Sequence, residues 1–173
     1  AKVVVADPRL TTTAAKANEW LAIKPGTDLA FALAMINVIV KEGLYDKDFV
    51  AKYTTGLDEV AKSVESYTPE WAAGLTEIPA ATIARVAREF ATTRPAVIAT
   101  HKRDAGGPNY ANSWRLAQAA VILNALVGSI DRPGGVIFER KPKLPSLDDT
   151  FPPPAYNIPV QERIDGLDKF PLL

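Results

Sequence analysis

AKVVVADPRLTTTAAKANEWLAIKPGTD, residues 1–28, is the stretch that decides the predicted fold of this 173-residue chain. The β-branched run at residues 3–6 is closed by Asp7-Pro8, which predicts a buried strand followed by a turn. Residues 20–23 predict a second strand. Pro25-Gly26-Thr27-Asp28 predicts a loop that ends in a helix N-cap at Asp28.

The rest of the chain predicts helices and one further strand. The helix at residues 29–42 has apolar side chains around nearly its whole circumference, so we expect it to be buried on more than one side. Thr68-Pro69 is typical of a helix start, with an N-cap followed by proline. The predicted elements are helices at 29–42, 46–53, 57–66, 69–75, 80–92 and 113–127, a third strand at 95–100, and a polar loop at 101–112.

This order predicts an α/β fold in which helices pack on a small parallel sheet. Ligands of such sheets bind at the carboxyl ends of the strands, so the loops at 7–13, 24–28 and 101–112 are expected at one edge. Eight of the 14 prolines follow residue 131, which excludes long helices there. We therefore expect an α/β unit at residues 1–130 and an extended connecting segment at 131–173.

Composition narrows the possible functions. Twenty basic residues balance 20 acidic ones, which argues against general attraction to nucleic acid. The chain has no cysteine, so it holds no disulfide, zinc–thiolate site or iron–sulfur cluster of its own. No apolar run is long enough to span a bilayer. A strand-like run at the first residues and an apolar last segment lead us to expect a fragment of a longer protein.

Three polar loops are candidate binding sites. Asp7, Arg9 and Thr11 offer a carboxylate, a guanidinium and a hydroxyl, which suit sugar, base or phosphate, although a strand end with a helix cap explains them too. Gly26 permits close approach of a ligand, and Asp28 suits the adjacent N–H donors of guanine, but a simple helix cap is the alternative. The chain lacks the Gly-x-Gly-x-x-Gly turn of ordinary NAD sites.

The third loop carries His101, Lys102 and Arg103, which suit an anionic ligand or, alternatively, a solvated surface. No serine or cysteine is paired with His101 in a recognisable nucleophile pattern, and we predict no catalytic residue and no metal ligand in this chain.

Taken together, the segments resemble one family. VADPRLTTTA at 5–14 and WLAIKPGTD at 20–28 are similar to the signature of molybdopterin guanine dinucleotide oxidoreductases, the DMSO-reductase superfamily. Further matching segments follow in order: EGLYD at 42–46, YTPE at 67–70, IP at 78–79, LNALVG at 123–128 and RPGG at 132–135. Each match alone is weak, and their number and order carry the resemblance.

The resemblance implies part of a Rossmann-like nucleotide-binding domain and a molybdopterin guanine dinucleotide cofactor with molybdenum or tungsten. It assigns the nucleotide contacts to Asp7, Arg9, Thr11, Gly26, Thr27 and Asp28, and contacts near the pterin to Thr100 and Asp104. It makes His101, Lys102 and Arg103 candidates for the substrate funnel.

The resemblance also describes a parent protein. The spacing after Gly135 and the segment at 162–172 look most like the catalytic subunits of thiosulfate and polysulfide reductases, with tetrathionate and arsenate reductases as near neighbours. It implies a 4Fe-4S cluster elsewhere in the parent polypeptide, an iron–sulfur partner subunit, a membrane anchor subunit and export to the outer face of the cytoplasmic membrane. The alternative is a free-standing α/β nucleotide- or partner-binding module without redox activity.

Overall fold

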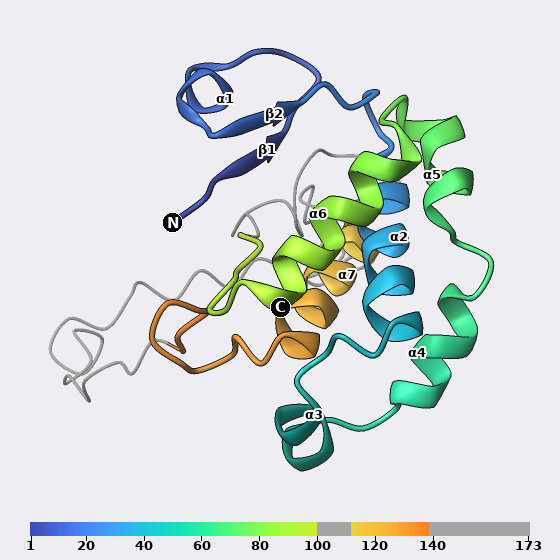
Figure 1. Cartoon of the computed structure of the whole chain (residues 1–173), viewed down its shortest axis with the longest axis vertical. Helices are drawn as coiled ribbons and strands as arrows, with labels where there is room; N and C mark the ends of the chain where they lie inside the picture. Colours follow the sequence, from blue (N-terminus) through green and yellow to red (C-terminus); the bar gives the residue numbers. More distant parts are fainter. Residues whose placement is uncertain (100–111, 139–173) are drawn as a thin grey trace, which may run out of the picture. The chain divides into compact units, whose positions relative to one another are not determined.

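Two short parallel strands and a larger group of helices form the part of the protein that the computed structural model describes, residues 1–99 and 112–138 (Figure 1). Strand β1 (Val4–Ala6) pairs with β2 (Glu19–Leu21) in parallel, with Val4 opposite Glu19 and Ala6 opposite Leu21. The prediction of an α/β fold with a small parallel sheet is therefore confirmed in outline.

Helix α1 (Thr12–Lys16) connects the two strands and was not predicted. Its N-cap is Thr11, whose hydroxyl accepts a hydrogen bond from the backbone N–H of Ala14 at 3.3 Å. Parallel strands need a crossover connection, and this short helix supplies it. Threonine has a low helix propensity, and the chain has three in a row here, so the sequence pattern did not predict this helix.

Helix α2 (Asp28–Lys41) lies at the centre of the helical group and confirms the helix predicted at 29–42. It packs against α4 (Leu57–Val64), α5 (Pro69–Thr76), α6 (Ala80–Thr92) and α7 (Ser113–Leu126). Its fully buried side chains include those of Ala34, Ile36 and Ile39. The expectation that this helix is buried on more than one side is correct. Helix α3 (Lys47–Tyr53) contacts α7.

Helix ends follow the predicted chemistry. Thr68 caps α5 by accepting a hydrogen bond from the N–H of Trp71, with proline as the first helical residue. Helices α2 and α7 both end in a left-handed glycine, Gly43 with φ 65° and Gly128 with φ 70°. In each case the two residues after the last turn donate hydrogen bonds back to its carbonyls, which is the Schellman motif.

The third strand, predicted at 95–100, is wrong for the part that the structure describes, because residues 96–99 belong to no strand. Ile98 pairs with a side chain instead of a strand. The carboxamide of Asn124, on α7, accepts a hydrogen bond from the N–H of Ile98 and donates one to its carbonyl. β-branched residues favour an extended backbone, but a strand also needs a neighbouring strand, and a local pattern does not show whether one is present.

Residues after α7 fold back on themselves. Ile130 and Val136 form an isolated parallel bridge, and Asp131 N–H donates to the carbonyl of Val136 at 2.7 Å. The compact unit extends to Phe138. The remainder of the predicted connecting segment lies outside the described residues, and so does residue 100 of the predicted third strand.

Candidate functional site

The carboxyl ends of β1 and β2 lie at one edge of the sheet, because the two strands are parallel and in register. The backbone N–H of Asp7 donates to the carbonyl of Leu21 at 3.1 Å, so the pairing continues one residue beyond β1. The turn that follows β1 and the loop that follows β2 therefore leave the sheet on the same side, as the parallel order predicts.

Asp7 shapes the first of these loops through internal hydrogen bonds. One carboxylate oxygen accepts from the N–H of Arg9 at 2.9 Å, and the other accepts from the hydroxyl of Thr11 at 3.0 Å. The indole N–H of Trp20 donates to the Asp7 carbonyl at 2.8 Å and ties the turn to β2. These contacts favour a structural role for the Asp7 carboxylate, with spare lone pairs on both oxygens.

Arg9 is the cation that this turn presents. Its side chain is exposed, and no described residue forms a hydrogen bond or ion pair with its guanidinium. The backbone at Arg9 is fixed by Asp7, and its carbonyl accepts from Thr11 N–H at 2.8 Å. A guanidinium on a fixed backbone without a protein partner suits a phosphate or another planar anion.

The second loop is a tight turn at residues 24–27. The carbonyl of Lys24 accepts hydrogen bonds from the N–H of Thr27 at 3.3 Å and from its hydroxyl at 2.6 Å. Gly26 has φ 80°, and a proline before a left-handed glycine is typical of a type II turn. Lys24 N–H donates to the carbonyl of Thr76 at the end of α5, which anchors the turn to the helical group.

The structure corrects the predicted N-cap of α2. Thr27, and not Asp28, occupies the cap, and Asp28 is the first residue of the helix. The Asp28 side chain is half-buried and has no hydrogen bond or ion pair with any residue that the structure describes. The capping explanation for Asp28 therefore does not hold, and its carboxylate is free to accept from a ligand.

These features fit the guanosine end of a dinucleotide. Asp28 offers two acceptor oxygens for the adjacent N–H donors of guanine, and Gly26, with φ 80°, adds no side chain to the turn before it. Arg9 offers donors for phosphate. Among the described residues, no group of three or more His, Cys, Asp or Glu side chains is placed to hold a metal ion.

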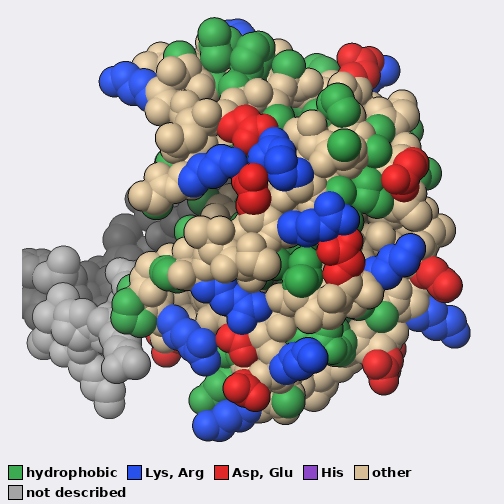
Figure 2. Space-filling view, viewed as in Figure 1, with side chains coloured by type: hydrophobic (Ala, Val, Ile, Leu, Met, Phe, Trp, Pro, Cys, Tyr) green, Lys and Arg blue, Asp and Glu red, His purple; other side chains and the backbone are tan. Residues whose placement is uncertain are grey.

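An ionic network holds β2 against α6. Glu19 pairs with Arg85 and lies 3.4 Å from the ammonium of Lys2, while Arg85 also bonds Glu89 at 3.0 Å. The hydrogen bond from Arg85 holds the pKa of Glu19 below its ordinary value, and Lys2 adds to the effect. Figure 2 shows basic and acidic side chains interspersed on this face, without a patch of one sign.

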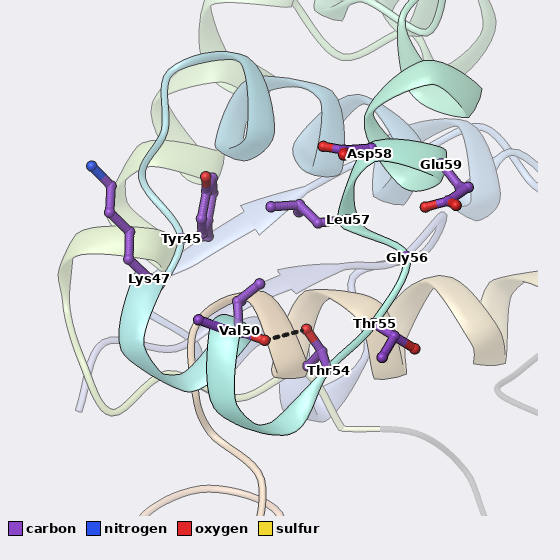
Figure 3. A pocket seen from close by; sticks show the side chains of 10 residues that line it. Tyr45, Lys47, Val50, Thr54, Thr55, Gly56, Leu57, Asp58 and Glu59 are labelled. Atoms are coloured by element: carbon purple, nitrogen blue, oxygen red, sulfur yellow. Dashed lines mark hydrogen bonds between the residues drawn. The ribbon is translucent and has the colours of Figure 1, made fainter.

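A groove of about 830 Å³ lies over α2 and is bordered by α4, α5 and α7. Gly26 and Thr27 lie at its wall, together with aromatic side chains of Tyr67, Trp71 and Trp114. A smaller pocket of about 440 Å³ lies between α3 and α4 and contains none of the predicted site residues (Figure 3).

Five of the predicted site residues lie outside the described part of the chain: Thr100, His101, Lys102, Arg103 and Asp104. The buried polar residue that sequence reasoning missed is Asn124, which bonds the backbone of Ile98. A signal for it was present, because it is the polar residue in the apolar run 119–127. No helix in the described ranges is long and apolar enough to cross a membrane.

Parallel strands that lead into polar turns are the arrangement at which α/β proteins commonly bind ligands. Comparison with known families identifies the group: the molybdopterin oxidoreductase model matches residues 1–146. The chain belongs to the molybdopterin oxidoreductase family. The resemblance that the sequence motifs predicted is thereby confirmed.

Individual relatives come from several activities. The chain is 42% identical to the thiosulfate reductase molybdopterin-containing subunit of Salmonella typhimurium strain LT2, over 82% of this chain and 18% of that protein. It is 36% identical to the arsenate respiratory reductase molybdopterin-containing subunit of Chrysiogenes arsenatis, over 99% of this chain and 23% of that protein. The chain thus spans less than a quarter of the length of either relative.

A solved structure is similar as well. Acetylene hydratase from Pelobacter acetylenicus matches with a TM-score of 0.65 and 38% identity, over 74% of this chain and 17% of that one. The fold of this region is therefore shared with a protein whose name gives a different substrate from those of the two relatives above.

Proposed function

We propose that this chain holds the guanosine end of a molybdopterin guanine dinucleotide within a longer molybdenum or tungsten oxidoreductase. The observation that carries the proposal is the Asp28 carboxylate, which stands beside a glycine turn at the start of α2 without a partner in the described residues. When bound, the cofactor would supply the redox-active metal. This chain's residues would bind and orient its nucleotide.

Each predicted nucleotide contact has a distinct part in this proposal. Asp28 accepts from the guanine edge, Gly26 and Thr27 line the approach to it, and Arg9 donates to phosphate. Asp7 and Thr11 act chiefly through the turn that they build, because their side chains bond each other at 3.0 Å. The N-terminus of α2 adds a favourable electrostatic field for the anionic part of the ligand.

The test compares two aspartates in the full-length parent protein. Asp28→Ala removes the proposed guanine acceptor, whereas Asp58→Ala removes an exposed carboxylate from the first turn of α4 and serves as the matched control. Loss of hydrogen bonds to a charged acceptor weakens retention about tenfold or more. We expect GMP released by acid hydrolysis, and bound molybdenum, to fall in Asp28→Ala and to stay at the wild-type level in Asp58→Ala. Equal retention in both variants would remove Asp28 from the site.

The parent protein is proposed to reduce a sulfur compound such as thiosulfate or polysulfide. The similarity to the thiosulfate reductase subunit supports this, while the arsenate reductase and acetylene hydratase relatives define the competing substrates. Thiosulfate-dependent oxidation of reduced methyl viologen by the purified parent tests it. Oxidation with arsenate and none with thiosulfate would reassign the substrate.

The wider architecture is also proposed. The described unit would form part of a Rossmann-like domain, and residues 131–173 would connect it, as an extended proline-rich segment, to the rest of the polypeptide. The parent would carry a 4Fe-4S cluster, associate with an iron–sulfur subunit and a membrane anchor subunit, and work at the outer face of the cytoplasmic membrane. Similarity to the thiosulfate reductase subunit supports this assembly, and co-purification of the subunits tests it.

A further inference from the structure

Helix α7 is apolar around nearly its whole circumference, as α2 is, and Arg115 is its one charged residue. A helix of this composition is normally buried on more than one side. For α2, four surrounding helices provide that burial. Among the described elements, α7 packs mainly against α2 and α3, and Trp114 and Val121 both remain 55% exposed. The described elements therefore leave the outward face of α7 without the cover that its composition predicts.

Helix α7 also forms one wall of the groove over α2. The floor of the groove is buried and apolar, and includes Ala30, Ile36, Val64 and Ala119. Its rim is apolar too, but exposed, with Trp71 and Leu75 from α5 and Trp114 from α7. Val121 lies seven residues after Trp114 on the same side of the helix, so the apolar exposure extends from the groove along α7. An exposed apolar surface that extends over several residues marks a site of interaction.

The chemistry of the groove favours an uncharged, apolar occupant. Of the described residues that line it, two are charged, and Glu59 on α4 and Arg115 on α7 have opposite signs. The Arg115 guanidinium lies 5.0 Å from the centre of the Trp114 ring, and the rings of Tyr67 and Trp71 are 4.7 Å apart. Tryptophan, tyrosine and arginine are enriched where proteins contact other polypeptides. An anionic small ligand would meet no net positive charge here, so a polypeptide is the better match.

We propose that the groove and the outward face of α7 dock an apolar segment of the parent polypeptide from outside residues 1–173. The chain spans 18% and 23% of the lengths of the two relatives, so more than three quarters of a polypeptide of that size lies outside it. Gly26 and Thr27 belong both to the wall of the groove and to the turn before α2, so the docked segment lies beside the proposed nucleotide site. This inference rests on the proposed function, which makes this chain part of a longer polypeptide.

Photo-crosslinking in the full-length parent protein tests the docking. The variant Trp114→benzoylphenylalanine places a photoreactive group on the rim of the groove. The same substitution at Lys62 is the matched control, because Lys62 is exposed on α4, which borders the groove, but does not line it. Mass spectrometry identifies the cross-linked peptides. Oxidation of Trp114 by hydroxyl radicals in the wild-type parent measures the same cover without any substitution, and it carries the test if the variant fails to fold.

We expect the group at position 114 to cross-link within one polypeptide to a peptide outside residues 1–173, in clearly higher yield than the group at position 62. A covered Trp114 should oxidise about tenfold more slowly in the native than in the urea-unfolded protein, whereas a Trp114 that keeps its 55% exposure should oxidise about half as fast.

Cross-links to a second copy, to another subunit or only within residues 1–173 would overturn the proposal. Equal yields at positions 114 and 62, or oxidation of Trp114 at about half the unfolded rate, would overturn it as well. Absence of molybdenum and GMP from the wild type would instead refute the proposed nucleotide site, and the cross-links would still identify what covers α7.

Discussion

Replacing Gly128 with alanine is expected to destabilise the protein more than replacing Gly43, although the two glycines occupy the same position in the same motif. Both follow a buried helix, and their φ values are 70° and 65°. The space around them differs. A Cβ on Gly128 would lie 2.6 Å from a carboxylate oxygen of Asp46, whereas a Cβ on Gly43 would meet nothing within 4 Å.

The magnitude follows from what Asp46 does. Forcing alanine into the left-handed region costs about 1 kcal/mol at either glycine. At Gly128 the new methyl group also displaces Asp46, which caps α3 by accepting from the N–H of Phe49 at 2.9 Å. Loss of such a cap costs about 1 kcal/mol. Asp46 further lies 3.5 Å from Arg94 and 3.6 Å from Arg132, and weakening these partly exposed pairs adds less.

The free energies of unfolding, measured in urea by tryptophan fluorescence, should therefore fall by about 1 kcal/mol for Gly43→Ala and about 2–3 kcal/mol for Gly128→Ala. In an Asp46→Ala background the extra cost at Gly128 should disappear, since the displaced group is absent. Equal losses for the two glycines, or an undiminished loss at Gly128 without Asp46, would refute the reasoning.

Two further predictions concern the strand region. Glu19→Gln should lower stability at pH 7 by about 1 kcal/mol or less, because Arg85 holds the pKa of Glu19 below its ordinary value. That stabilisation is fully present above the unfolded pKa of about 4.3 and is lost as pH falls through the lower folded-state pKa. The unfolding free energies of the two proteins, measured in urea, should therefore converge as the pH falls through that folded-state pKa, and a constant gap would contradict the assignment. Thr11→Ala removes both the N-cap of α1 and the hydrogen bond to Asp7, so it should lower the unfolding free energy by about 1–2 kcal/mol in the same assay. An unchanged unfolding free energy would show that other contacts hold this turn.

Long helices were predictable because their apolar pattern persists over many residues. The prediction at 29–42 became α2 (Asp28–Lys41), and that at 113–127 became α7 (Ser113–Leu126). Their glycine stops were predictable too, since a left-handed helix end favours glycine. The start of α5 was predictable as well, because the fixed φ of Pro69 suits the first turn of a helix.

Elements that depend on distant partners were harder to predict. Val97 and Ile98 favour an extended backbone, but Asn124 and not a strand pairs with Ile98. The cap of α2 lies at Thr27 because the Pro25-Gly26 turn sets where the helix begins, and that turn is closed by backbone contacts that the sequence does not display. The candidate site depends on an Asp28 side chain that has no hydrogen bond to any described residue. The sequence suggested a capping role for Asp28, and the structure excludes that role.

The position of the guanine ring in the cofactor-loaded parent protein tests the central claim most directly. A crystal structure of that protein should place a carboxylate oxygen of Asp28 within hydrogen-bond distance, about 2.7–3.2 Å, of the guanine N1 or N2. It should also place Arg9 beside a phosphate oxygen. A guanine ring bound elsewhere, with Asp28 in contact only with protein or solvent, would contradict the account.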